Sequence, residues 1–177
     1  MSLDGFVNDR SGSVGALYAD FDTLRNTEPM RESIQNTGAV VMGRNAFMMA
    51  EDPDSYADNY EFQVPIFVLT QQVPKKKPKE TSQLTITFVT DGLESAIQQA
   101  KAAAGDKDVT IIGGAGTIQQ CLKAGLADEL HVDIMPVLLC SGLRLFENIS
   151  AEHIQLERIK VVELPAGRTH LRFRFVK

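Results

Sequence analysis

The sequence predicts an α/β protein with a mixed, mostly parallel central sheet flanked by helices and an antiparallel β-hairpin at the C-terminal end. Three observations lead to this prediction. Short apolar runs alternate with helical patterns through the first two thirds of the chain, which is typical of a parallel sheet. Two long strand-like segments then close the chain. The length of 177 residues suits one ordinary domain, so we expect residues 1–177 to fold as a single domain.

The first quarter of the chain is expected to hold one helix, one strand and a second helix. Residues 2–6 have the pattern of a strand end followed by a turn, so we expect a leading strand to be missing. Residues 28–36 predict a helix with Pro29 in its first turn, where a proline is tolerated. Residues 39–42 are continuously apolar, as in a short buried strand, and residues 44–50 carry helix formers with aromatic and Met anchors.

The middle of the chain continues the alternation. Residues 65–70 and 84–89 predict two strands, and Asp91 with Glu94 predicts a capping box for the next helix. In that helix one buried stripe recurs with helical spacing, and Gly105 ends the helix. The stripe consists of Leu93, Ala96, Ile97 and Ala100. A strand at 109–112 follows, then a glycine-rich turn, then a helix with Ile118, Cys121 and Leu122 on one face.

The last third is expected to be antiparallel. Leu130, Val132 and Ile134 alternate with polar residues, so that His131 and Asp133 are expected to point to the same side of a half-exposed strand. Segments 153–164 and 169–176, joined through Pro165-Ala166-Gly167, predict a β-hairpin.

Composition and charge argue against several classes of protein. A net charge of -5 disfavours a nucleic-acid partner, because such proteins neutralise phosphates with an excess of Lys and Arg. No apolar run approaches the roughly 18 residues of a membrane helix, so we expect no membrane partner. Cys121, Cys140 and the three histidines lack the spacing of metal ligands, so we predict no metal site. We expect both cysteines to be free thiols, which indicates a protein of the reducing cytoplasm.

The turn 113–117 is the first candidate for a binding site. Its sequence, Gly-Gly-Ala-Gly-Thr, follows a strand directly and opens a helix. Glycines let a ligand approach the backbone closely, and a helix start offers N–H groups to a phosphate. Chain reversal between a strand and a helix explains the same glycines equally well. A Walker loop is excluded because no Lys follows, and a Rossmann site is disfavoured because Gln119 stands where the third glycine belongs.

A second strand end passes through glycine into a helix at Gly43. Arg44 could pair with a phosphate there, and two such turns can hold opposite parts of one dinucleotide. The alternative is that Arg44 is a surface cation. The basic segment 75–79 likewise indicates either a solvated loop or a source of positive potential for a bound phosphate.

Seven short segments, spread over nearly the whole chain, share one order and spacing with a known family. They are 2–6, 41–44, 67–70, 112–116, 125–130, 136–139 and 144–146. Together they resemble the dihydrofolate reductase-like family, and most closely its branch related to the C-terminal reductase domain of the bifunctional deaminase-reductase of riboflavin biosynthesis. The resemblance implies NADPH at the carboxyl edge of the sheet.

The resemblance also implies which residues bind the cofactor. The two turns would face the phosphates, while the end of the strand 65–70 would face the adenosine 2′-phosphate. The implied residues are Gly43, Arg44, Asn45, Ala46, Thr70, Gln71, Gly113, Gly114, Ala115, Gly116, Thr117 and Ile118. Two positions depart from the family. Ala46 replaces a Thr of many members, and Cys140 stands where glycine is common.

Reduction by NADPH also needs a group that protonates the acceptor. Folate reductases use an acidic residue on the first helix, so the resemblance makes Asp20 the candidate catalytic residue, although an acidic residue at a helix start is also a typical N-cap. Asp4 is the candidate substrate-binding residue, although an Asp-Gly pair is also typical of a turn.

Three functions follow from these observations. The first is an NADPH-dependent reductase of a small heterocycle, most like 5-amino-6-(5-phosphoribosylamino)uracil reductase. The second is dihydrofolate reductase, which the pattern around Asp20 disfavours, and the third is a non-catalytic nucleotide-binding protein. Family relatives are commonly dimers, so we also expect a homodimer, with either the polar face of His131 and Asp133 or the apolar C-terminal strands as its interface.

Overall fold

The computed structural model describes residues 1–149 and 153–176. The chain forms two compact units. Residues 32–118 form one, here called the central unit, and residues 1–31 and 119–177 form the other, here called the terminal unit. The chain passes from one unit to the other within helix α2 (Glu28–Asn36) and again within helix α6 (Ala115–Lys123).

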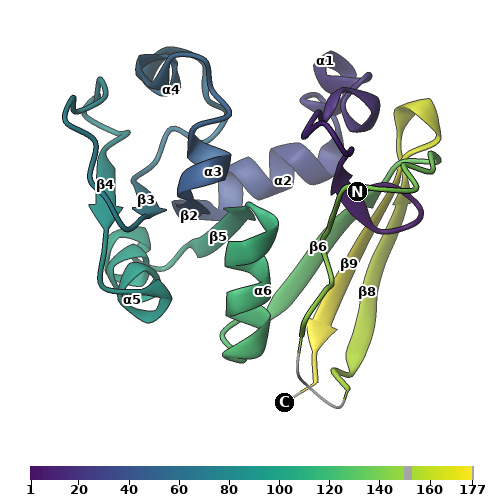
Figure 1. The fold of residues 1–177 in the computed structure, drawn as a ribbon. Helices are drawn as coiled ribbons and strands as arrows, with labels where there is room; N and C mark the ends of the chain where they lie inside the picture. The colour runs from purple at the N-terminus through teal and green to yellow at the C-terminus, as the bar shows by residue number, and fades with distance from the viewer. Residues whose placement is uncertain (150–152, 177) are drawn as a thin grey trace. The chain divides into compact units, whose positions relative to one another are not determined.

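The central unit is built on a parallel sheet of four strands in the order β4-β3-β2-β5 (Figure 1). These strands are β2 (Thr37–Gly43), β3 (Ile66–Leu69), β4 (Ile86–Val89) and β5 (Asp108–Gly113). Val40, Val41, Ile66 and Val68 are fully buried. The continuous apolar runs therefore mark strands covered on both faces, as expected for a parallel sheet.

Short helices follow the first strands of this unit, and one long helix covers the sheet. They are α3 (Arg44–Phe47), the 3-10 turn Pro53–Ser55, α4 (Tyr56–Asn59) and α5 (Leu93–Ala104). Helix α5 packs against β2, β3 and β5 (Figure 1). Its predicted stripe is confirmed, because all four residues are buried, and Gly105 ends the helix in the left-handed region, with a φ of 62°.

Two local predictions in the central unit were wrong. The Asp91 and Glu94 side chains form no capping box, since Gly92 is the N-cap of α5 and Asp91 accepts a hydrogen bond from the Ser95 hydroxyl at 2.8 Å. Helix α3 ends at Phe47 rather than at residue 50. Phe47 is its buried anchor, whereas Met48 and the methionine after it are exposed and add no packing that would extend the helix.

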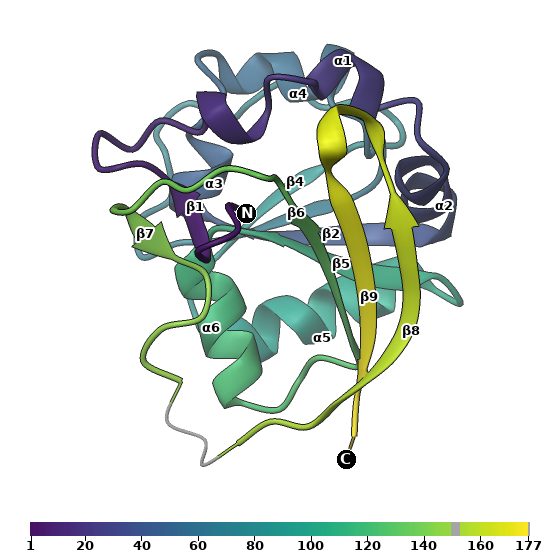
Figure 2. The same ribbon diagram turned by 90° about the vertical axis from the view of Figure 1, so that its right-hand side faces the viewer.

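The terminal unit holds two antiparallel sheets. Strand β1 (Phe6–Asn8) pairs with the short β7 (Leu143–Arg144), a pairing that the sequence pattern did not predict. The larger sheet has the order β6-β9-β8, and Figure 2 shows its three strands side by side. They are β6 (Glu129–Ile134), β8 (Leu156–Glu163) and β9 (Thr169–Phe175). Pro165–Gly167 closes the predicted hairpin between β8 and β9.

The remaining elements of the terminal unit lie near its N-terminus. A 3-10 turn at Gly15–Leu17 precedes α1 (Phe21–Leu24), and α2 begins at Glu28, as predicted. Ser2 forms a single parallel bridge with Met135, and the chain then turns at Gly5, where φ is 89°.

The register of the larger sheet separates a polar face from an apolar face. Asp133 pairs with His170, and His131 pairs with Arg172. Val132 pairs with Leu171 on the opposite face. The predicted alternation along β6 is confirmed, because successive residues of a strand point to opposite sides.

The α/β fold class is confirmed, with the parallel strands and the C-terminal antiparallel strands hydrogen-bonded in separate sheets. The single-domain organisation of residues 1–177 stays a prediction. Within residues 1–149 and 153–176, no helix is both long enough and apolar enough to cross a membrane.

Candidate functional site

The carboxyl ends of β2 and β5 bring the two predicted phosphate turns together in the central unit. Met42 at the end of β2 is in register with Gly113 at the end of β5. A Cβ atom added to Gly43 would lie 3.6 Å from the Gly114 nitrogen and would clash with the Thr117 hydroxyl. Gly43 is therefore required by close packing of one turn on the other.

The glycine-rich turn contains glycines of two kinds. Gly113 has a φ of 129° and so occupies a conformation that other residues rarely adopt. Gly114 and Gly116 have no such φ, and a Cβ added to either would meet no atom within 4 Å. Chain reversal thus explains Gly113, and a cis peptide bond joins it to Gly114, whereas neither backbone conformation nor internal packing explains Gly116.

Helix α6 starts at this turn and is the longer of the two helices that follow the predicted phosphate turns. The Gly114 carbonyl accepts hydrogen bonds from the Thr117 and Ile118 N–H groups at 3.0 and 3.2 Å. Ala115 and Thr117 are buried, whereas Gly116 is exposed. The first turn of the helix is therefore held from inside the protein, and its outer side is open at Gly116.

The other predicted cofactor residues differ in how accessible they are. Arg44 and Asn45 are exposed, and Ala46 is half-buried. Thr70 is buried, and its hydroxyl both donates to the Gln72 carbonyl at 3.0 Å and accepts from the Gln72 N–H at 3.2 Å. Gln71 is exposed. Of the two residues at the end of β3, Gln71 is the one that presents its side chain to solvent.

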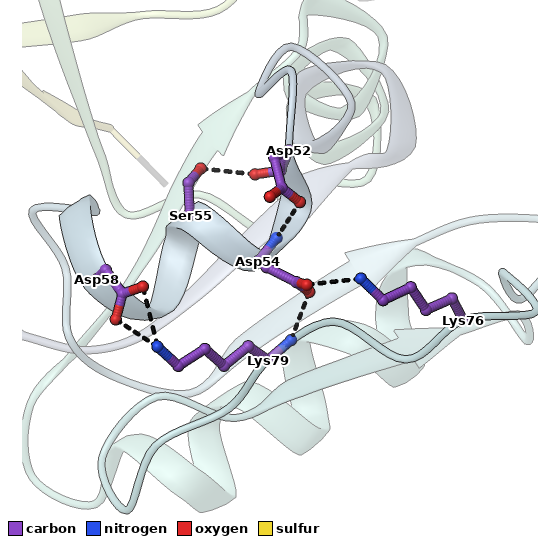
Figure 3. A network of polar contacts seen from close by, with 6 residues as sticks. All are labelled: Asp52, Asp54, Ser55, Asp58, Lys76 and Lys79. Atoms are coloured by element: carbon purple, nitrogen blue, oxygen red, sulfur yellow. Dashed lines mark hydrogen bonds and ion pairs between the residues drawn. The ribbon is translucent and has the colours of Figure 1, made fainter.

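The basic loop is largely neutralised by neighbouring carboxylates (Figure 3). Lys76 pairs with Asp54 at 2.6 Å, and the Lys76 ammonium group holds the pKa of that carboxyl below its usual value. Lys79 pairs with Asp58 at 2.7 Å, and its backbone N–H donates to Asp54 at 2.9 Å. Lys77 pairs with a carboxylate of its own loop, Glu80, at 2.8 Å. Four lysines thus face three carboxylates, so the loop contributes little more than one net positive charge.

Asp4 is engaged within the terminal unit. Its carboxylate accepts hydrogen bonds from the Ser2 hydroxyl at 2.6 Å and from the backbone N–H groups of Leu139 and Cys140 at 3.2 and 2.8 Å. These bonds, the one from Ser2 above all, lower the pKa of Asp4. Cys140 has a φ of 62°, in the left-handed region. This conformation is the physical reason why glycine suits position 140, where the chain departs from the family.

Asp20 is the partner of a buried arginine. The Arg168 guanidinium donates from Nε to Oδ2 of Asp20 at 3.1 Å and from Nη2 to Oδ1 at 2.5 Å, and Nη2 also donates to the Leu17 carbonyl at 2.7 Å. The two side chains are 2% and 8% exposed. Asp20 occupies the N-cap position of α1, but its side chain makes no capping hydrogen bond.

This pairing determines the ionisation of Asp20. Hydrogen bonds from Arg168 lower the pKa of the Asp20 carboxyl, whereas a general acid requires a raised one. The sequence did not indicate Arg168 as this partner, because it lies 148 residues away from Asp20 along the chain. The only local signal was the position of this cation directly after the predicted hairpin turn, which gives no indication of its partner.

The polar face of the larger sheet carries further polar contacts. Asp133 lies 2.7 Å from Nδ1 of His170, and Arg172 donates to Glu129 at 2.6 Å. His131 lies 3.3 Å from the same Glu129 oxygen. Within the described part of the chain, no three His, Cys, Asp or Glu side chains are arranged to hold a metal ion.

Comparisons with known proteins agree with this architecture. The uncharacterised protein YyaP of Bacillus subtilis is 24% identical over 174 residues, which cover 94% of this chain and 87% of that protein. A crystal structure of a candidate riboflavin biosynthesis protein from Shewanella sp. PV-4 superposes with a TM-score of 0.80 at 23% identity, covering 100% of this chain and 96% of that one.

A more distant structure extends the likeness to folate enzymes. Dihydrofolate reductase from Enterococcus faecalis, solved in complex with NADP(H), superposes with a TM-score of 0.61 at 13% identity, covering 100% of this chain and 93% of that one. The fold is therefore dihydrofolate reductase-like. The family model of the RibD C-terminal domain matches residues 1–169. The chain thus belongs to the RibD C-terminal domain family.

Proposed function

We propose that this protein is an NADPH-dependent reductase of a small heterocyclic substrate, most like 5-amino-6-(5-phosphoribosylamino)uracil reductase. One observation carries the cofactor assignment. Gly116 lies in the open first turn of α6, although neither backbone conformation nor packing requires glycine there. A ligand that approaches the backbone closely supplies the missing reason for Gly116. Membership of the RibD C-terminal domain family supports the reductase activity.

The residues of both turns suit a dinucleotide. In our proposal the N–H groups at the start of α6, from Gly114 to Gly116, bind the phosphates, where the helix dipole favours negative charge. Thr117 and Ile118 hold this turn through the bonds of their N–H groups to the Gly114 carbonyl. Arg44, exposed after the tightly packed Gly43, pairs with a phosphate from the second turn together with Asn45 and Ala46. When bound, NADPH supplies the hydride.

The adenosine 2′-phosphate is assigned to the end of β3. The exposed Gln71 is the proposed donor, and the Thr70 hydroxyl shapes the turn through its two bonds to Gln72. The lysine loop plays a smaller role than its composition indicates, because carboxylates offset three of its charges.

The two carboxylates named as catalytic and substrate-binding candidates receive different roles in this proposal. Asp20 stays ionised and orders the segment from Leu17 to Asp20 through Arg168, rather than donating a proton. Asp4 orders the turn after Ser2 through its bonds to residues 139 and 140, and its contribution to substrate binding is through the shape of that turn.

Two other functions are distinguished from this proposal by the binding and turnover experiments below. Dihydrofolate reductase activity is supported by the shared fold but disfavoured by the ionised state of Asp20. A non-catalytic nucleotide-binding protein would retain the glycine turn and lack turnover. A homodimer, a cytoplasmic location and the absence of nucleic-acid, membrane and metal partners stay predictions.

The first experiment measures thermal unfolding with NADPH and with NADH separately, because a ligand that binds the native state raises the midpoint. We expect a larger shift with NADPH. Gly116→Ala is the sharpest variant, because the added methyl group meets no protein atom and replaces glycine in a helix. It should keep or raise the midpoint of the free protein and weaken NADPH binding at least tenfold. No shift of the wild type with either nucleotide would refute the cofactor assignment.

Side-chain variants test the phosphate contacts. Arg44→Ala should weaken NADPH binding more than Lys79→Ala, since Lys79 is already paired with Asp58. Equal effects would contradict the assignment of Arg44. NADPH oxidation is then followed with the phosphoribosylaminouracil substrate and with dihydrofolate, and binding without turnover of either would favour the non-catalytic alternative.

A further inference from the structure

Strand β4 lies at one end of the parallel sheet of the central unit (Figure 1). A cavity of about 380 Å³, here called the β4 groove, is lined by this strand and by the lysine loop before it. The strand contributes residues 86–88, and the loop contributes residues 73–75 and 77. Because successive residues of a strand point to opposite faces of a sheet, a cavity that touches three in a row runs along the edge of the strand. All of these residues belong to the central unit.

The hydrogen-bond pattern of the sheet determines which backbone groups of β4 face this groove. Strand β3 and the residue after it donate N–H bonds to the carbonyls of Thr85 and Val89, at 2.8 and 3.0 Å. In a parallel pair, successive residues direct their N–H and C=O groups alternately toward the partner strand and away from it. Thr85, Thr87 and Val89 therefore face β3, and the backbone groups of Ile86 and Phe88 face the outer edge.

One of these outward groups already binds a carboxylate. The Ile86 N–H donates to Oε1 of Glu80 at 2.7 Å, and this bond lowers the pKa of the Glu80 carboxyl. Within residues 1–149 and 153–176, no group bonds to the Ile86 carbonyl or to the N–H and carbonyl of Phe88. The edge therefore offers one donor and two acceptors to an added strand, next to a position where an acidic side chain is already stabilised.

The loop side of the groove is both cationic and apolar. Lys77 pairs with Glu80 at 2.8 Å, whereas Lys75 is exposed and, in the described part of the chain, has no carboxylate partner. Val73 is 59% exposed. The groove thus combines unpaired backbone groups, an apolar wall and one unpaired positive charge.

We infer that the β4 groove binds an extended acidic segment of another protein, which adds to the central sheet as a strand beside β4. In such complexes the main-chain hydrogen bonds supply affinity and alternate side chains supply specificity. The N–H groups of the segment donate to the carbonyls of Ile86 and Phe88, and one of its carbonyls accepts from the Phe88 N–H. Its acidic side chains pair with Lys75, and its apolar side chains contact Val73. The inference concerns a second site and does not depend on the proposed reductase activity.

A second copy of this chain is the competing occupant, because an open edge can also pair with its own counterpart. Two copies joined through β4 would bring the lysine loop of each, with its unpaired Lys75, to the same junction, where like charges repel. Lysines beside an edge strand are a common protection against such self-pairing. An acidic segment meets attraction at the same position, so the charge of the groove favours it over a second copy.

The probe is a synthetic hexapeptide of alternating Glu and Val, which places its carboxylates on one face when it is extended. Its binding to the complete 177-residue chain is followed by fluorescence anisotropy at low ionic strength. We expect saturable binding, and Lys75→Glu should weaken it roughly tenfold, because a repulsion replaces an attraction. Lys101→Glu makes the same change on an exposed lysine of α5 that does not line the groove, and should bind like the wild type. Near-UV circular dichroism checks that both variants are folded.

Two measurements test whether the peptide pairs with the strand. Amide hydrogen exchange, followed by NMR, should slow at Phe88 when the peptide binds, and should stay unchanged at Thr87, whose N–H already faces β3. A fully N-methylated peptide keeps the same charge and has no N–H donors, so its binding should be at least about tenfold weaker.

Several results would overturn the inference. The first is the absence of saturable binding to the wild type, and the second is a folded Lys75→Glu variant that binds as tightly as Lys101→Glu. Equal binding of the N-methylated peptide would mean that only charge is recognised. Bound peptide that leaves Phe88 exchange unchanged would lie elsewhere on the protein. Slower Phe88 exchange caused by higher protein concentration alone would mean that a second copy occupies the groove.

Discussion

Replacing Asp20 by asparagine tests whether this residue holds the structure or donates a proton. The change keeps the size of the side chain and removes its negative charge. Arg168, whose side chain is 2% exposed, would then carry a buried charge without its counter-ion. Breaking a buried ion pair from one side typically costs about 3–5 kcal/mol. The asparagine oxygen can still accept one hydrogen bond from Arg168, so we expect the lower end, about 3 kcal/mol.

This cost corresponds to a measurable shift in thermal unfolding. For a chain of this length, 1 kcal/mol lowers the midpoint by about 2–4 °C, so Asp20→Asn should lower it by roughly 6–12 °C at neutral pH. Asp22→Asn is the matched control, because Asp22 is an exposed carboxylate two residues further along. Its effect should stay within about 0.5 kcal/mol.

The pH dependence gives a second, independent measurement. Arg168 lowers the pKa of Asp20 in the folded state relative to about 3.9 for an aspartate in the unfolded chain. The pair therefore stabilises the fold fully above the unfolded pKa, and this stabilisation is lost as the pH falls through the lowered, folded-state pKa. The stability difference between wild type and Asp20→Asn should be constant from neutral pH to about pH 5 and shrink below about pH 4.

Two results would refute this reasoning. One is an Asp20→Asn variant as stable as the Asp22→Asn control, and the other is a stability difference that does not change at acidic pH. If the variant were fully stable and had lost only turnover, Asp20 would be the proton donor after all.

Further substitutions test the packing of the central unit. The hydroxyl of Tyr60 is buried without a hydrogen-bond partner, so Tyr60→Phe should change the unfolding free energy by between zero and about 1 kcal/mol in the stabilising direction. The Tyr56 hydroxyl donates to the Phe47 carbonyl at 3.0 Å, so Tyr56→Phe should lower the unfolding free energy by about 1 kcal/mol. Chemical denaturation measures the unfolding free energy of both variants. A Tyr60→Phe variant less stable than Tyr56→Phe would contradict these hydrogen-bond assignments. Gly43→Ala should destabilise the fold by about 1–3 kcal/mol through its clash with the Thr117 hydroxyl, and Thr117→Ala in the same chain should recover part of that loss; no recovery in thermal unfolding would count against this contact.

Much of the fold could be predicted from the sequence, because helices and strands produce a local periodicity of apolar residues. The stripe of α5 and the alternation along β6 depend only on the repeats of a helix and a strand. Predictions that needed the competition between neighbouring groups were less successful. Asp91 could have capped α5 or accepted from Ser95, and only the folded geometry selects the second.

The candidate site shows the same division. The sequence shows glycines at 113, 114 and 116 after a strand, but it could not separate Gly113 and Gly114, which form the turn through a cis peptide bond, from Gly116, which neither the backbone nor packing requires. That distinction depends on φ and on the empty space around each Cα, which the three-dimensional arrangement determines.

By itself the sequence determined the element types, the two strand-to-helix turns and the resemblance to a reductase family. The tertiary structure decided which side chains are available for chemistry. It paired Asp20 with Arg168, engaged Asp4 and the Thr70 hydroxyl within turns, and matched the lysine loop with carboxylates. The physical reason is that periodicity is a property of neighbouring residues, whereas a charge or a hydrogen bond is completed by whichever partner the fold brings within about 3 Å.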